Sequence, residues 1–403
     1  MSRLLISALL ALIAWTPVQA QDDGASSSEC DTVLSTIERL GPSRLASLDG
    51  GTWVVYEDRI SRQPLRRALQ LVGETHDALE GCGIEGIAPQ RFGMRLPALR
   101  RDGETMTLAQ SAAFPSSASG LHLDLELELL YNFAIDYPED WFRDRIALAP
   151  KVKFWWPNGL IFSAQYAFPI RNQQPERHAQ YWSSPYPNML MAGLRKRLAP
   201  NWIGAVSTGF YERNRYGGDA QLYWISERWP IVLGGRVSAT GYWSYSDGEL
   251  ERSAVDFWTG YVDGTLYLPW HNIRLRARSG QFYREISQFK RQGEDIKLFP
   301  GTSGEITRMF GETEIGLHAF YNGSVVYPGF RFAAPLSPRR GLKRGRVAAY
   351  PTRQHYVPYD LGRVVRGKNT GFVRPKRGEL HRTELDIWGD LRMLAPEMRN
   401  RFN

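Results

Sequence analysis

The sequence predicts a mainly β protein: an antiparallel transmembrane β-barrel of about 12 strands, preceded by a small α+β periplasmic domain. Three observations support this fold class. Apolar and polar residues alternate along many segments, short and long connections between these segments take turns, and tryptophans gather at the short connections. A soluble β-sandwich would also alternate, but it gives no reason for turns to sort by length or for tryptophan to collect at one end.

The first 20 residues have the features of a cleaved signal peptide. Arg3 precedes an apolar run from Leu4 to Trp15, and Val18-Gln19-Ala20 is a small-residue cleavage signal. A transmembrane anchor is the alternative, but the run is shorter than the about 20 residues that a spanning helix needs. We therefore predict export, with a signal peptide over 1–20, the periplasmic domain over 21–111, a linker over 112–120 and the barrel over 121–403.

Composition narrows the class of partner. No later stretch approaches the ~18 apolar residues of a membrane helix, whereas a mean hydropathy of −0.38 with 13 Trp, 19 Tyr and 18 Phe suits strands that are apolar on one face only. The net charge of +8 suits nucleic acid, anionic glycan or lipid phosphate, and export argues against nucleic acid. Cys30 and Cys82 either pair in an oxidising periplasm or stay free, and two cysteines are too few for an ordinary four-ligand zinc site.

The predicted periplasmic domain contains two helices and two strands. Helical spacing runs from Cys30 to Leu40, and a second helix begins at Pro64 and ends near Gly81. Thr52 to Asp58 has the pattern of a strand, with which Arg91 to Leu96 is expected to pair.

In the predicted barrel, long connections follow the odd-numbered strands and short turns follow the even-numbered ones, as in outer-membrane barrels. Four of the five short turns carry or adjoin a tryptophan, at Trp156, Trp202, Trp229 and Trp270. The expected strands lie within 121–133, 146–154, 160–168, 190–198, 202–211, 219–225, 231–243, 258–268, 273–278, 313–319, 330–334 and 383–391.

The cost of charge decides which face meets lipid, because Arg or Lys there costs roughly 2 to 4 kcal/mol at mid-membrane. Charged faces are therefore expected to point inward, with the acidic ladder of the first strand beside the lysines of the second. The predicted lumen-lining residues are Asp124, Glu126, Glu128, Lys151, Lys153, Arg274, Arg276, Arg278, Arg382 and Glu384.

Two basic regions have two interpretations each. The row of Arg274, Arg276 and Arg278 either balances charge in the lumen or guides an anionic polymer. The basic segment 338–378 is either a solvated loop or a contact for anionic glycan or lipopolysaccharide, and strand parity would place it outside the cell or back in the lumen.

The sequence predicts no catalytic residue, no cofactor and no metal site. The seven histidines are scattered without ligand spacing. His122 and His318 would face the lumen, so a hydrolase with a Ser/His pair is an alternative, although no Gly-x-Ser-x-Gly motif supports it. The acidic ladder of Asp124, Glu126 and Glu128 favours structural ion pairs over a glycosidase carboxylate pair, because lysines adjoin it.

Several phrases resemble the YjbH-type family of exopolysaccharide-biosynthesis outer-membrane proteins. They are Val54-Val55-Tyr56-Glu57-Asp58-Arg59 with Pro64-Leu65, the aromatic- and Gly-rich strands, and Gly329-Phe330-Arg331-Phe332-Ala333-Ala334-Pro335-Leu336 before a basic stretch. The resemblance spans most of the mature chain and implies a barrel that serves with polysaccharide synthesis and export proteins, without catalytic residues to carry over. Longer members look as though they hold more than one barrel-like region, whereas only one fits here, which leaves open whether a companion barrel protein is needed.

The expected function is therefore that of a non-enzymatic outer-membrane barrel in the biosynthesis or export of an extracellular polysaccharide. Its expected partners are that polysaccharide, other synthesis and export proteins in the periplasm or outer membrane, and the lipid bilayer. The alternatives are a general porin or a lipid or lipopolysaccharide transporter and, behind them, an outer-membrane hydrolase.

Overall fold

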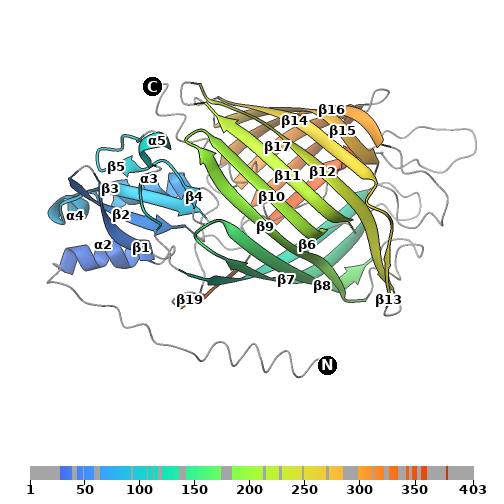
Figure 1. The fold of residues 1–403 in the computed structure, drawn as a ribbon, viewed down its shortest axis with the longest axis horizontal. Coiled ribbons are helices and arrows are strands. Elements are labelled where there is room, and N and C mark those ends of the chain that lie inside the picture. The colour runs from blue at the N-terminus through green and yellow to red at the C-terminus, as the bar shows by residue number, and fades with distance from the viewer. Residues whose placement is uncertain are drawn as a thin grey trace, which may run out of the picture.

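The protein is mainly β, with two separate sheets and a few short helices (Figure 1). The computed structural model describes residues 28–38, 43–48, 50–58, 64–91, 94–106, 108–111, 113–116, 120–135, 142–173, 184–211, 215–226, 229–246, 249–268, 272–284, 298–310, 313–321, 326–334, 342–344, 347–351, 355–360 and 378–379. The predicted signal peptide, Trp270, the last predicted strand, Arg382 and Glu384 lie outside these residues. No helix in the described part of the chain is both long and apolar enough to span a bilayer.

The N-terminal module, which we define as the elements from α2 to α5, has a five-stranded sheet covered by helices. Its elements are α2 (Ser28–Glu38), β1 (Ser43–Leu48), β2 (Gly51–Glu57), α3 (Pro64–Glu74), α4 (His76–Gly81), β3 (Ile84–Arg91), β4 (Met94–Arg95), β5 (Leu99–Arg100) and α5 (Leu108–Ser111). Apolar residues of α2, α3 and α4 pack on β2 and β3, around Val54 and Tyr56. Burial raises the pKa of the Tyr56 phenol, an effect increased by Asp58 and opposed by Arg67.

Two predictions about this module need correction. The partner of β2 is β3, which pairs with it in parallel, and not the segment Arg91–Leu96. That segment holds β4, which pairs with the end of β3. The sequence predicts no strand at the position of β1, which pairs antiparallel with β2 on the side opposite β3. Two parallel strands are joined by a crossover, here α3 and α4, so the partner of β2 does not follow it directly in the sequence. A local sequence pattern therefore does not indicate this pairing.

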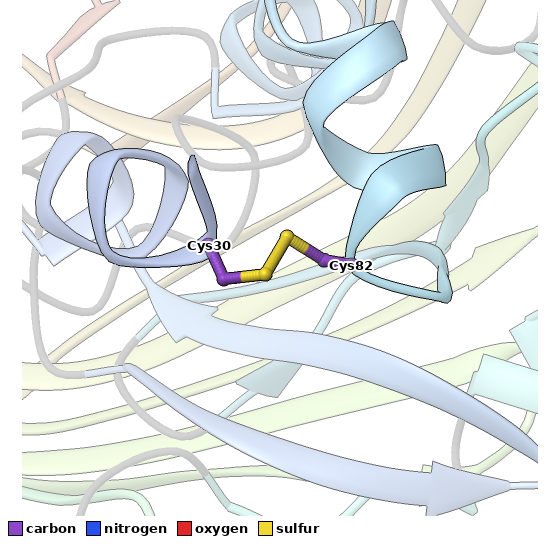
Figure 2. The surroundings of a disulfide bond; sticks show 2 residues. All are labelled: Cys30 and Cys82. Carbon is purple, nitrogen blue, oxygen red and sulfur yellow. A yellow bond between two sulfur atoms is a disulfide. The ribbon is translucent and has the colours of Figure 1, made fainter. Parts of the chain in front are cut away.

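Cys30 and Cys82 form a disulfide (Figure 2). It joins α2 to the residue that follows α4, across 52 positions of sequence. The two helices are thereby held together on one side of the small sheet.

The large sheet holds all remaining strands, and consecutive long strands pair antiparallel. Its long strands are β6 (His122–Ile135), β7 (Phe142–Trp155), β8 (Leu160–Asn172), β9 (Tyr186–Ala199), β10 (Trp202–Tyr211), β11 (Arg215–Ile225), β12 (Ile231–Ser246), β14 (Phe257–Leu268), β15 (Ile273–Arg284), β16 (Leu298–Phe310), β17 (Thr313–Tyr321) and β18 (Val326–Ala334). The short strands are β13 (Glu249–Arg252), β19 (Leu342–Arg344), β20 (Val347–Pro351), β21 (His355–Asp360) and β22 (Gly378–Glu379). Figure 1 shows the sheet curling round, with its strands tilted.

The connections β7–β8, β9–β10, β11–β12, β14–β15 and β16–β17 all lie at one end of the large sheet, which we call the short-turn end. The N-terminal module contacts this end. The Arg195 side chain of β9 donates a hydrogen bond to the carbonyl of Arg91, and the Arg197 side chain bonds the carbonyl of Arg95.

Strand β16 is the main difference from the predicted order of strands. The sequence predicts no strand between 278 and 313, yet Leu298–Phe310 pairs with β15 on one side and β17 on the other. The additional strand reverses the direction expected for β17 and β18. Since Ala333 of β18 pairs with Glu314, next to the β16–β17 turn, β18 ends at the short-turn end. The segment 338–378, described only in part, thus follows a strand that ends at the short-turn end, so the strand parity from which its position was predicted was wrong.

Candidate functional site

The inner face of the large sheet gathers the polar and charged side chains, and we treat it as the candidate site. Along β8, Ile161, Ser163 and Gln165 are buried, while the alternating Leu160 and Phe162 are exposed. The same alternation leaves apolar side chains on the outer face of the neighbouring strands. Examples are Val206, Leu233, Val237, Val262, Ile315, Leu317, Phe330 and Phe332. Successive side chains of a strand point to opposite faces, so the sequence alternation translates directly into this sorting.

The first cluster of inner charges joins β6 to β7. Lys151 Nζ lies 3.2 Å from Glu128 Oε2 and 3.6 Å from Glu126 Oε2, and Lys153 Nζ lies 3.8 Å from Glu126 Oε2. The register places Asp124 opposite Lys153 and Glu126 opposite Lys151. The carboxylates of β6 thus lie opposite the lysines of β7, and the positive charges of the lysines balance the negative charges of the carboxylates.

Uncharged polar groups extend this cluster across the next two strands. The Gln165 amide of β8 donates to Glu128 Oε2 at 2.9 Å, and the Asn188 amide of β9 donates to Gln165 Oε1 at 2.7 Å. At the other end of the ladder, Trp155 Nε1 donates to Asp124 Oδ2 at 3.1 Å. A continuous polar chain therefore crosses four strands of the inner face.

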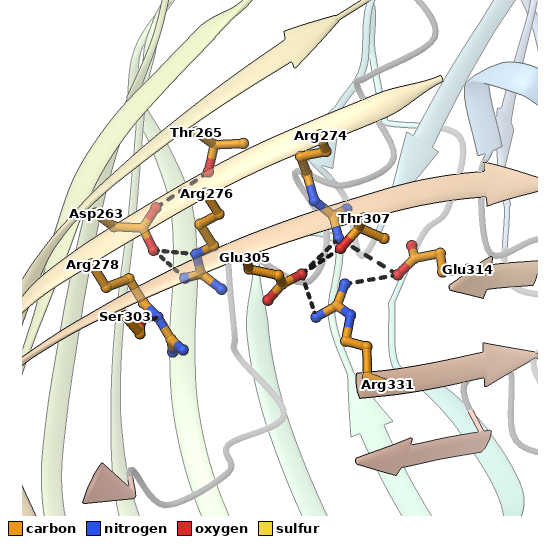
Figure 3. Close-up of polar contacts among 10 residues, drawn as sticks. All are labelled: Asp263, Thr265, Arg274, Arg276, Arg278, Ser303, Glu305, Thr307, Glu314 and Arg331. Carbon is orange, nitrogen blue, oxygen red and sulfur yellow. Dashed lines mark hydrogen bonds and ion pairs between the residues drawn. The ribbon is translucent and has the colours of Figure 1, made fainter. Parts of the chain in front are cut away.

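The second cluster joins β15, β16, β17 and β18 (Figure 3). Arg331 contacts two carboxylates, with Nη1 2.7 Å from Glu305 Oε1 and Nη2 3.0 Å from Glu314 Oε2. Arg274 Nη2 lies 3.4 Å and 3.6 Å from the same two oxygens. Two arginines and two glutamates thus alternate in a buried quartet, so each charge has an opposite neighbour, the arrangement that buried ions require.

Beside the quartet, Arg276 and Arg278 have different surroundings. Arg276 Nε donates to Asp263 Oδ2 at 2.6 Å, and Thr265 donates to the other oxygen of Asp263 (Figure 3). The Arg278 Nε group donates to Ser303 Oγ at 3.0 Å, and its guanidinium lies 5.7 Å from the centre of the Tyr261 ring. Two members of the predicted arginine row are thus in ion pairs, which favours charge balance over a guide for an anionic polymer.

A third cluster surrounds Asp219 of β11. Arg236 Nε lies 2.5 Å from Asp219 Oδ2, Ser238 donates to the same oxygen at 2.8 Å, and Gln221 donates to Oδ1 at 2.9 Å. None of these residues was predicted as a site residue. The available signal was a lone carboxylate at an inward position of β11.

Of the predicted lumen-lining residues, the structure brings together two groups. Asp124, Glu126, Glu128, Lys151 and Lys153 form the first cluster, and Arg274, Arg276 and Arg278 lie in or beside the second. The prediction that Arg382 closes the ring against the acidic ladder falls outside the described residues, as does Glu384. Glu305 was missed because no strand was predicted at its position, and Asp263, Glu314 and Arg331 because single charges carry little signal before their partners are known.

The two histidines weighed for a hydrolase lie on different strands and have different neighbours. His122 begins β6 and stacks on Trp155, with ring centres 4.5 Å apart, while His318 pairs with Glu305 across β16 and β17. Among the described residues, no group of three or more His, Cys, Asp and Glu side chains is placed to hold a metal ion.

These features define a mainly β protein with a large antiparallel sheet that carries ionic networks on its inner face and apolar side chains on its outer face. In comparison with known proteins, the chain matches no family model and no curated protein.

Proposed function

We propose that this chain is a non-enzymatic outer-membrane β-barrel protein that takes part in the biosynthesis or export of an extracellular polysaccharide. The single observation behind the membrane placement is the row of large apolar side chains exposed at mid-strand on the outer face. Val262 is 68 % exposed and Leu317 is 66 % exposed. Exposed apolar surface on this scale marks contact with another apolar phase, and acyl chains supply it.

Two further features support a barrel that spans the membrane. The order of hydrogen-bonded strands returns to the strand from which it starts. A closed sheet has no free edge, which is what a strand structure in lipid requires. The strands also have the length to cross a bilayer, since β6 has 14 residues and β14 has 12, against the about 9 to 11 that a tilted strand needs.

The role in polysaccharide production rests on the resemblance to YjbH-type proteins together with the predicted export. The N-terminal module, predicted to be periplasmic, then lies at the periplasmic end of the barrel, where it is available to synthesis and export partners. The inner clusters argue against a general porin, because large ion-paired side chains on the inner face narrow the lumen, and wide water channels are typical of about 16 to 18 strands.

A lipid or lipopolysaccharide transporter is the second candidate, and one observation favours it. The first strand of the barrel, β6, meets β20 in a parallel pairing of only five residues, Leu123–Leu127 with Val347–Pro351, whereas β6 and β7 pair over their full lengths. Pro351 has no backbone N–H to donate. Such a seam is the natural place for a lipid to pass sideways between lumen and membrane.

Deletion of the gene tests the proposal. We expect the deletion strain to lose its surface polysaccharide while small solutes still enter at the normal rate, and the full chain to restore the polysaccharide. Slow uptake of small solutes with normal polysaccharide would favour a porin, and altered outer-leaflet lipid with normal polysaccharide would favour the transporter. A gel of the membrane-extracted protein supplies the physical control, since a folded barrel should migrate differently before and after heating.

A further inference from the structure

At the short-turn end, six of the strands from β7 to β16 carry apolar side chains on the inner face. Trp155, Ile161, Ile203, Ile225, Tyr267 and Met309 belong to one buried cluster there, and we call these six residues the collar. Each lies within two residues of the end of its strand. Farther along the same strands the inward residues become polar, as Lys153, Gln221 and Thr265 illustrate. The six collar residues therefore lie at the short-turn end, where the inward residues Arg274 and Glu314 also lie near the starts of β15 and β17.

One residue of the N-terminal module completes the collar. Leu96 is 3 % exposed and belongs to the same apolar cluster, of which it is the one member from the module among the described residues. It follows β4, at the edge of the module that faces the large sheet. The Leu96 side chain thus packs at the end of the barrel, although Leu96 belongs to the N-terminal module.

Hydrogen bonds hold this edge of the module in place. Arg195 Nη2 donates to the Arg91 carbonyl at 3.2 Å, and the Arg197 side chain donates to the Arg95 carbonyl and, at 2.6 Å, to the Pro200 carbonyl. Arg91 in turn donates to the Asp58 carbonyl at the end of β2, so the edge is braced by the module's own sheet. Two arginines of one barrel strand therefore hold the backbone at the last residue of β3 and at the last residue of β4.

We propose that the collar and Leu96 form a closed gate at the periplasmic end of the barrel, and that displacement of the N-terminal module opens it. This inference rests on the proposed membrane barrel. A constriction lined by apolar side chains excludes water and ions even where it is not sterically sealed. The contacts that hold the module at the gate are hydrogen bonds to backbone carbonyls and the packing of Leu96. A partner that binds the module can therefore displace the module without unfolding either sheet.

The test is ion conductance of the full chain in planar lipid bilayers. We expect the unaltered protein to be nearly silent and Leu96→Asp to raise the conductance at least about tenfold, because a charge in the collar attracts water. Leu45→Asp is the matched control: Leu45 also belongs to the module and is 52 % exposed on β1, and its replacement should leave conductance at the unaltered level. An unaltered protein that conducts as well as Leu96→Asp would overturn the gate.

A second measurement keeps the gate testable if Leu96→Asp fails to fold. In the full chain carrying Leu96→Cys, a membrane-impermeant maleimide should label the new thiol slowly. Adding Arg195→Gln and Arg197→Gln should accelerate labelling by about tenfold or more, since hydrogen bonds from charged groups are lost. Fast labelling of Leu96→Cys alone contradicts the proposal. Heat-dependent gel mobility of the same samples reports the barrel itself, so failure of the gate and failure of the barrel can be told apart.

Discussion

Single residues of the inner face act through their partners. Arg331 is 2 % exposed and contacts both Glu305 and Glu314. Removing one partner of a buried ion pair is costly because the remaining charge keeps its desolvation penalty and loses its compensation. The identity of the residue matters less than the balance of the quartet to which it belongs.

Arg331→Met should therefore lower the free energy of unfolding by about 3 to 5 kcal/mol. The measurement is urea unfolding in liposomes, followed by gel mobility without heating. Adding Glu314→Gln should recover part of the loss, since two carboxylates would otherwise share the single remaining guanidinium of Arg274. The control is Arg308→Met, because Arg308 lies exposed on the outer face, over the ring of Phe310, and its loss should change stability by no more than about 0.5 kcal/mol. Equal effects of Arg331→Met and Arg308→Met would contradict the quartet's role.

At the scale of elements, the module and the large sheet are stabilised in different ways. The module is small and combines two apolar clusters with a disulfide between α2 and the end of α4. The large sheet relies on pairing of each long strand with both neighbours and on the inner clusters. A cross-link matters most where the core is small, because a small core supplies little stability of its own.

Replacing both cysteines, Cys30→Ser with Cys82→Ser, should destabilise the module by about 4 kcal/mol, the chain-entropy value for a cross-link that spans 52 positions. The measurement is the rate of limited proteolysis within residues 28–111 of the full chain. A reducing agent should have the same effect on the unaltered protein and no effect on the double variant. Unchanged proteolysis after reduction would show that the apolar clusters are sufficient.

Strand β16 illustrates what the sequence could not predict at this scale. Its outward positions include Pro300, Thr302, Gly304 and Arg308, which give little of the apolar signal that marks its neighbours. Strand preference depends on packing against neighbouring strands more than on the residue itself. Pairing with β15 and β17 supplies that context, and it exists only in the assembled sheet.

At the scale of the whole molecule, the cost of placing a charge on the outer face shows whether that face lies in a membrane or in water. Val262→Arg on β14 separates the two: at the centre of a bilayer the change should cost about 2 to 4 kcal/mol, whereas at a watery surface it should cost at most about 0.5 kcal/mol. The measurement is urea unfolding in phosphatidylcholine liposomes. Leu45→Arg, on the exposed surface of the module, is the control and should be nearly neutral. A neutral Val262→Arg in a protein that stays dissolved without detergent would rule out the membrane barrel.

The sequence by itself determined the mainly β class, the helices that begin near Cys30 and Pro64, and most long strands, because side-chain periodicity is a local property of a strand or helix. It also placed the acidic ladder beside Lys151 and Lys153, since the two strands follow one another in the chain and the alternation in each fixes which side chains share a face. Only the tertiary structure decided that Leu298–Phe310 is a strand, that Arg331 joins Glu305 and Glu314, and that Leu96 enters the collar. These contacts join residues that are distant in the sequence, and their relative positions depend on the register of every strand between them. A local sequence pattern does not contain that information.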